Sequence, residues 1–139
     1  MVRLIVGEKG KGKTKVLLDK VNAEVKESQG SVIYLDKSTK NMHELSNKVR
    51  LINVSEYNLS SSDEFVAFIL GLLSGNYDIQ EIFIDSYLKI AAINGCDMAA
   101  NLDRLSEISK KFNINLTLSV SCNKDSIPDN YQSSIIVSL

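Results

Sequence analysis

Residues 7 to 14 read Gly7-Glu8-Lys9-Gly10-Lys11-Gly12-Lys13-Thr14 and match the pattern G-x-x-x-x-G-K-[ST]. A near-continuous apolar run precedes the motif at residues 2–6. Apolar residues at helical spacing follow it from about Lys13 to Ser28. The pattern therefore lies between a predicted buried strand and a predicted amphipathic helix, which is the context that it requires.

The residue types of this motif suit a phosphate chain. Glycines let the backbone bend around an anion without a Cβ clash, and the N–H groups that begin the next helix donate to it. Lys13 would bring a positive charge to the β- and γ-phosphates, and the Thr14 hydroxyl is an oxygen ligand of the kind that Mg²⁺ prefers. A glycine- and lysine-rich surface turn is the alternative. The predicted nucleotide-binding residues are Gly7, Glu8, Lys9, Gly10, Lys11, Gly12, Lys13, Thr14 and Lys15.

A carboxylate ends a second apolar stretch, Glu81-Ile82-Phe83-Ile84-Asp85. In phosphate-binding loops of this type, an acidic residue at the end of a neighbouring strand supports the magnesium ion. We therefore predict Thr14 and Asp85 as the metal-binding residues. Asp36 ends the apolar stretch of residues 31–36 in the same way and ranks second for this role.

Strand and helix patterns alternate along the rest of the chain. We expect a short strand at residues 49–54, a helix behind the capping box Ser61-x-x-Glu64, a helix over 98–112, and strands at 114–120 and 134–137. This alternation predicts one domain over residues 1–139, a three-layer α/β sandwich with a mainly parallel sheet of five or six strands. Ligands of such sheets bind at the carboxyl ends of the strands.

Composition and charge limit the classes of function. The chain has 139 residues, of which 44% are hydrophobic and 24% charged, as in ordinary globular domains. No apolar run approaches the roughly 18 residues of a membrane-spanning helix. A net charge of −1 does not support nucleic-acid binding by the surface as a whole. Residues 1–50 nevertheless hold eleven basic and six acidic residues, which suits an anionic ligand there or, alternatively, a solvated basic face.

The two cysteines, Cys96 and Cys122, do not form a disulfide framework. The apolar residues at the start of the sequence are too few for a secretion signal. We therefore expect a cytoplasmic protein in which both thiols are small core residues.

The strand, the glycine-rich loop and the strand-end acid together resemble the P-loop NTPase superfamily. At least one strand lies between the loop strand and the Asp85 strand, as in the RecA-like branch with RecA, DnaB-type helicases and KaiC, a core that PilT-type ATPases share. Ile84-Asp85-Ser86-Tyr87-Leu88 and the segment from Leu105 to Ser121 extend the likeness. The resemblance implies ATP and Mg²⁺ as ligands and homo-oligomeric rings. It also implies a polar γ-phosphate sensor at the end of the fourth strand, for which the candidates are Ser119, Ser121 and Asn123.

The chain departs from this family at the catalytic glutamate. RecA-like ATPases carry a glutamate just after the second strand, which orients the attacking water; the matching position is near Ser38, and no glutamate is present. Ser86 occupies the alternative position directly after Asp85. Asp36 is the nearest replacement, so the predicted catalytic residues are Lys13 and Asp36. Without such a carboxylate we expect slow hydrolysis.

Two functions therefore remain open at this point. The first is a minimal RecA-like ATPase that binds magnesium and ATP. The second is a non-hydrolysing nucleotide-binding switch or assembly subunit, with a second copy or another protein as its partner. A phosphotransferase ranks third because it needs a substrate pocket, for which the sequence shows no residues. ATP is favoured over GTP by the resemblance and by the lack of an Asn-Lys-x-Asp motif.

Overall fold

The computed structural model describes residues 1–93 and 98–139. Its strands are β1 (Val2–Gly7), β2 (Ser31–Asp36), β3 (Val49–Asn53), β4 (Ile79–Ile84), β5 (Asn115–Ser121) and β6 (Ile135–Ser138). Its α-helices are α1 (Lys13–Val25), α2 (Ser62–Gly75), α3 (Tyr87–Ile90) and α4 (Met98–Phe112). Short 3₁₀ turns are η1 (Met42–Glu44), η2 (Val54–Tyr57), η4 (Lys124–Ser126) and η5 (Asp129–Ser134).

The six strands form one sheet in the order β3-β2-β4-β5-β1-β6, and every adjacent pair is parallel. Strand β5 lies between β1, which leads into the glycine-rich loop, and β4, which leads into Asp85. This order confirms the predicted parallel sheet and places a strand between the loop strand and the Asp85 strand.

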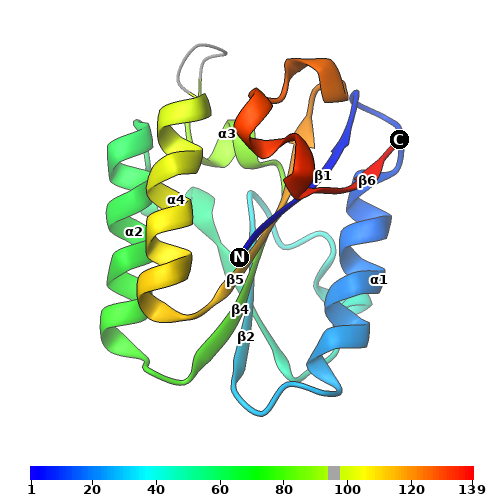
Figure 1. Cartoon of the computed structure of the whole chain (residues 1–139). Helices are drawn as coiled ribbons and strands as arrows, with labels where there is room; N and C mark the ends of the chain where they lie inside the picture. The colour runs from blue at the N-terminus through cyan, green and yellow to red at the C-terminus, as the bar shows by residue number, and fades with distance from the viewer. Residues whose placement is uncertain (94–97) are drawn as a thin grey trace.

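Helices cover both faces of the sheet and make three layers (Figure 1). Helices α2 and α4 lie on one face, and α1 lies on the other. Successive residues of β2 alternate between the two cores: Ile33 and Leu35 pack on the α2–α4 side, whereas Val32 and Tyr34 pack on the α1 side. The strand is buried on both faces, which explains why its sequence is apolar throughout.

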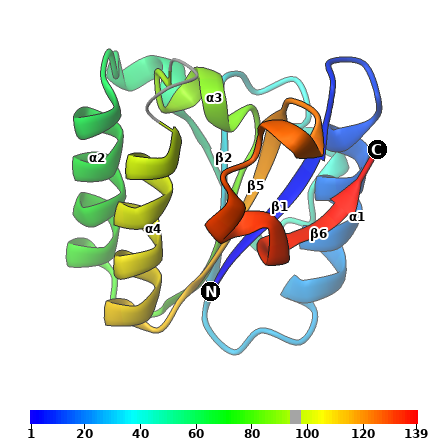
Figure 2. The same cartoon turned by 45° about the horizontal axis from the view of Figure 1, so that its top comes forward.

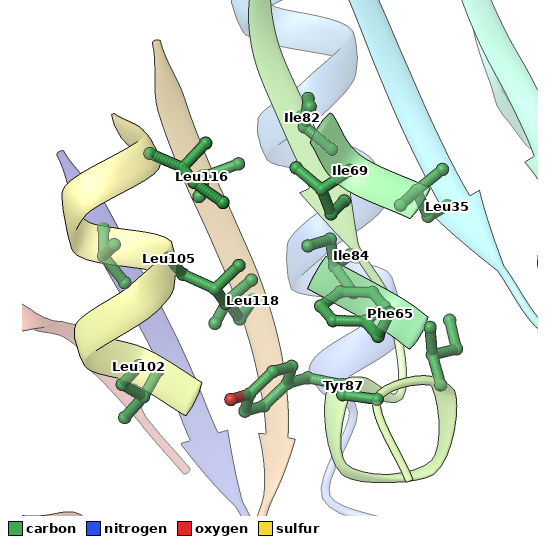
Figure 3. Packing of buried hydrophobic residues seen from close by; sticks show 14 of the residues in the cluster. Leu35, Phe65, Ile69, Ile82, Ile84, Tyr87, Leu102, Leu105, Leu116 and Leu118 are labelled. Carbon is green, nitrogen blue, oxygen red and sulfur yellow. The ribbon is translucent and has the colours of Figure 1, made fainter. Parts of the chain in front are cut away.

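The larger core lies between the sheet and helices α2 and α4 (Figure 3). Phe65 of α2 packs edge-on against Tyr87 of α3, with ring centroids 6.2 Å apart. The Tyr87 hydroxyl donates to Asn101 of α4 at 2.5 Å. Tyr87 is fully buried, and these two contacts fix α3 at the end of β4.

Two local expectations differ from the structure. Helix α1 ends at Val25 rather than near Ser28, and in the turn that follows it the Glu27 N–H donates to the Glu24 carbonyl, three residues back. At α2, the Ser61 hydroxyl accepts from the Glu64 N–H as predicted. The Glu64 carboxylate, however, accepts from the N–H of Ser60 at 2.7 Å, one residue before the cap, so the box is displaced by one position.

Candidate functional site

The predicted site residues lie at the carboxyl edge of the sheet. The loop after β1 and the short helix α3 lie at this edge, which comes forward in Figure 2. Parallel strands end on the same side, so residues that follow β1, β4 and β5 meet there. A cavity at this edge measures about 330 Å³ and is lined by residues that follow β1, β2 and β4 and by Ser121 at the end of β5.

The loop backbone adopts conformations that depend on glycine. Gly10 has φ +86° and Gly12 has φ +98°, which is a region that residues with a Cβ rarely adopt. Gly12 is the N-cap of α1 and offers no side chain to the N–H groups of the first turn, which holds no acidic residue either. These N–H groups therefore stay available to an anion, at the positive end of the helix dipole.

Lys13 folds back over the loop. Its side chain is 7% exposed, and its ammonium donates to the Glu8 carbonyl at 3.1 Å. Burial lowers the pKa of Lys13, and the nearby Asp85 carboxylate opposes this effect. The hydrogen-bond partner of this ammonium is a neutral carbonyl, so an anion bound in the loop would further stabilise its charge.

Thr14 and Asp85 are in direct contact across the cavity. The Thr14 hydroxyl donates to Asp85 at 3.0 and 3.3 Å. The carboxylate also accepts from the Tyr34 hydroxyl at 3.1 Å, the Ser119 hydroxyl at 2.6 Å and the Ser86 N–H at 2.9 Å. Donors from four segments of the chain therefore hold Asp85 in one orientation.

The Thr14 hydroxyl and the Asp85 carboxylate fit a magnesium ion in their chemistry, because both present hard oxygen atoms. Among the described residues, no group of three or more His, Cys, Asp and Glu side chains gathers as a metal site. Magnesium usually takes one or two protein oxygens and completes its shell with water and substrate phosphates. The pair thus suits an ion that arrives with a phosphate chain.

Within the part of the chain that the structure describes, five lysines and one carboxylate, that of Asp85, line the cavity. Lys9 and Lys13 belong to the glycine-rich loop, and the other three lysines are Lys37, Lys40 and Lys89. The positive charges of Lys37 and Lys9 lower the pKa of Lys89, which places these side chains close together. The cavity therefore carries an excess of positive charge that a polyanion would neutralise.

Sequence reasoning missed Lys37, Lys40, Lys89 and Tyr34. Lys37 directly follows β2, and Lys89 lies four residues beyond Asp85, so a search of strand ends for cations as well as acids would have found both. Tyr34 lies inside a strand, two residues before its end, and its apolar neighbours hide the hydroxyl that reaches Asp85.

Asp36 does not line the cavity. Its side chain is 1% exposed, and its oxygens accept from the Lys37 N–H at 2.7 Å and the Asn41 amide at 3.3 Å. Burial, together with the charge of Asp85, raises the pKa of Asp36. In this arrangement the carboxylate holds the turn after β2, with one oxygen engaged by Lys37 and the other by Asn41.

The other predicted loop residues take different positions. Glu8 contributes its backbone carbonyl, which accepts from the Lys11 N–H as well as from Lys13. Lys15 points outward, since its side chain is 81% exposed and pairs with Asp19 at 3.3 Å. A Cβ at Gly7 would lie 3.0 Å from the Leu139 side chain. The missing side chain of Gly7 therefore leaves room for the residue that follows β6.

The three residues predicted as γ-phosphate sensors make different contacts. Ser121 lines the cavity, whereas Ser119 donates its hydroxyl proton to Asp85. The Asn123 side chain accepts from the Asp125 N–H and caps the η4 turn.

Both cysteines were predicted to be small core residues. Cys122 is half-buried, and Cys96 lies outside the described residues.

Comparison with solved structures finds similarity to the flagellar accessory protein FlaH from Methanocaldococcus jannaschii. The TM-score is 0.56 and the sequence identity 15%, with 95% of this chain and 65% of that chain covered. The chain therefore spans 65% of the length of the FlaH structure. The fold is RecA-like. The sequence matches no protein-family model and no curated protein.

One further property concerns membranes. Within residues 1–93 and 98–139, no helix has the length and apolar character needed to span a bilayer.

Proposed function

We propose that this protein binds a nucleoside triphosphate, ATP, together with Mg²⁺. The observation that carries the proposal is the convergence of Lys13, Thr14 and Asp85 on one cavity that is rich in lysine. The RecA-like fold supports it, because the cavity lies at the sheet edge where such folds bind ligands. A neutral or cationic ligand would leave the lysine charges without compensation.

In this proposal each residue has a separate task. The first-turn N–H groups of α1 and the Lys13 ammonium bind the phosphates. Gly10 and Gly12, with their positive φ angles, keep the loop open around the phosphates. Thr14 and Asp85 would hold the magnesium ion. The bound ion would supply positive charge that neutralises part of the charge of the phosphates.

Calorimetric titration with ATP, GTP and ADP, each with Mg²⁺ and again with a chelator, tests the proposal. We expect one site that binds the triphosphates more tightly with Mg²⁺ than without it. The ratio of ATP to GTP affinity measures the base preference directly. Absence of binding for all three nucleotides at millimolar concentration would exclude the proposal.

A second candidate function is a nucleotide-binding switch or assembly subunit that does not hydrolyse its ligand. The position of Asp36 favours it over the ATPase, because among residues 1–93 and 98–139 Asp85 is the one carboxylate that lines the cavity. An ATPase that uses Asp36 must show steady-state phosphate release that falls in Asp36→Asn. The switch predicts bound ATP with no release above buffer in either protein.

A further inference from the structure

A second cavity adjoins the phosphate cavity. It measures about 320 Å³ and is built from the turn after β2, the η2 turn after β3 and helix α3. Lys37 and Lys89 line both cavities. A ligand in the second cavity and a phosphate chain in the first would therefore contact the same two ammonium groups.

The second cavity joins an apolar surface to these two cations. Val54 and Ile90 are buried residues whose side chains line it, and Leu59 is a half-buried one. Lys37 and Lys89 are exposed, and neither forms an ion pair within residues 1–93 and 98–139. Such a surface matches a small molecule with an apolar part and a doubly charged anionic end.

Charge repulsion makes the shared position favourable for an anion. The ammonium groups of Lys37 and Lys89 are close enough for Lys37 to lower the pKa of Lys89. Lys37 and Lys89 bring two positive charges to the position that the two cavities share, and a phosphate dianion there would neutralise both. A single carboxylate carries only half of the charge needed.

We propose that the second cavity binds a small phosphomonoester with an apolar group, and that the protein transfers the terminal phosphoryl group of its nucleotide to that phosphate. The inference rests on the proposed function, because the donor is the triphosphate in the first cavity. Lys37 and Lys89 neutralise the repulsion between the two anions as they approach.

The transfer balances without a proton. An anionic oxygen of the acceptor phosphate forms a bond to the γ-phosphorus, while the bond from that phosphorus to the β–γ bridging oxygen breaks. The products are a nucleoside diphosphate, which keeps the bonding electron pair, and the diphosphate ester of the acceptor. Because the attacking oxygen is already deprotonated, this reaction needs no carboxylate base, which agrees with the buried Asp36 and with Ser86.

Phenyl phosphate is a suitable probe of the second cavity. The full chain is first saturated with Mg²⁺ and a non-hydrolysable ATP analogue and is then titrated by calorimetry with phenyl phosphate or with inorganic phosphate. We expect phenyl phosphate to bind at least about tenfold more tightly, because only it fills the apolar part of the cavity. Equal affinity for the two probes would overturn the apolar recognition.

Substitutions of the residues that line the second cavity test whether phenyl phosphate binds there. Lys37→Ala and Lys89→Ala should each weaken phenyl phosphate by about tenfold, the loss of one charge-assisted contact. Leu59→Glu should weaken it at least as much, since Leu59 lines the second cavity and not the first. Lys48→Ala is the matched control, because this exposed lysine lines neither cavity, and we expect a change within about twofold. Equal weakening by Lys48→Ala would contradict the site.

Phosphorus NMR of the chain with Mg²⁺, ATP and phenyl phosphate tests the transfer. We expect ADP and phenyl diphosphate in equal amounts, and loss of both signals in Lys89→Ala. Inorganic phosphate as the sole phosphorus product besides ADP, or phenyl phosphate that binds without reacting, would overturn the transfer. Absence of analogue binding in the first step would instead mean that the proposed nucleotide binding itself fails, so the two failures are distinguishable.

Discussion

The Thr14 hydroxyl lies 3.0 Å from an Asp85 oxygen, although 71 residues separate the two in the chain. Thr14 begins helix α1 after the glycine-rich loop, and Asp85 follows β4. Strand β5 lies between their strands, and the Ser119 hydroxyl of β5 reaches the same carboxylate. The parallel sheet thus joins the loop and the strand-end acid through direct hydrogen bonds.

The first prediction concerns the charge of Asp85. Asp85→Asn keeps one oxygen acceptor and removes the negative charge, so the gain in ATP affinity on addition of Mg²⁺ should fall by about 10–100-fold. Calorimetry with and without Mg²⁺ measures this gain. Asp129→Asn is the matched control, since Asp129 is exposed in η5 and should leave the gain unchanged. If Mg²⁺ raised the ATP affinity of Asp85→Asn as much as that of the wild type, Asp85 would not be part of the ion site.

The second prediction concerns Tyr34 and alkaline pH. Burial, followed by the Asp85 charge, raises the pKa of Tyr34 above its ordinary value of 10.0. The unfolded chain therefore loses this proton at a lower pH than the folded chain, and stability falls as the pH rises above about 10. Phenylalanine has no proton to lose, so Tyr34→Phe removes this pH dependence. Between pH 9 and 11, the free energy of unfolding of the wild type should fall by about 1.4 kcal/mol more than that of the variant.

Urea unfolding at pH 9, 10 and 11 measures this difference. Tyr131, whose pKa burial raises to about 12, is present in both proteins, and its contribution cancels. At pH 7 the variant should be less stable by about 1–2 kcal/mol, because Asp85 loses a buried donor. Parallel curves for the two proteins from pH 9 to 11 would argue against a proton held by Tyr34.

The third prediction contrasts two glycines. Gly12→Ala places a Cβ at φ +98°, which should cost roughly 1–2 kcal/mol of stability and weaken nucleotide binding. Gly71→Ala lies in α2, where an added Cβ meets nothing within 4 Å, and it should stabilise the chain by about 0.5–1 kcal/mol. Thermal unfolding of both variants tests the contrast. A neutral Gly12→Ala would mean that the left-handed turn is not required.

Much of the fold follows from local sequence patterns. Strand β4 is apolar from Ile82 to Ile84, where it is buried on both faces, and α4 shows a helical repeat because one face packs on the sheet. The motif at residues 7–14 predicted the strand–loop–helix order because its glycines and the flanking patterns act locally. Exact ends, such as that of α1 at Val25, depend on single turns that the periodicity does not encode.

The candidate site was less accessible to sequence reasoning. Thr14 and Asp85 carry recognisable patterns, whereas the contact of Tyr34 with Asp85 depends on strand order and on the face to which β2 directs each side chain. Lys37 follows β2 and Lys89 lies in α3, so both line one cavity only because these two segments meet at the sheet edge. Asp36 ends a strand as Asp85 does, but the turn after β2 buries it, a difference that the sequence pattern of the two strand ends does not reveal.

The central claim is that the loop at residues 7–14 binds the phosphates of a nucleotide, and titration of Mg²⁺ and ATP into the wild type and Lys13→Ala tests it most directly. Lys48→Ala serves as the control, because this exposed lysine lies outside the cavity. We predict one saturable site in the wild type and in Lys48→Ala, and binding at least about tenfold weaker in Lys13→Ala. No heat of binding in the wild type up to millimolar ATP, or equal affinity in Lys13→Ala, would contradict the account.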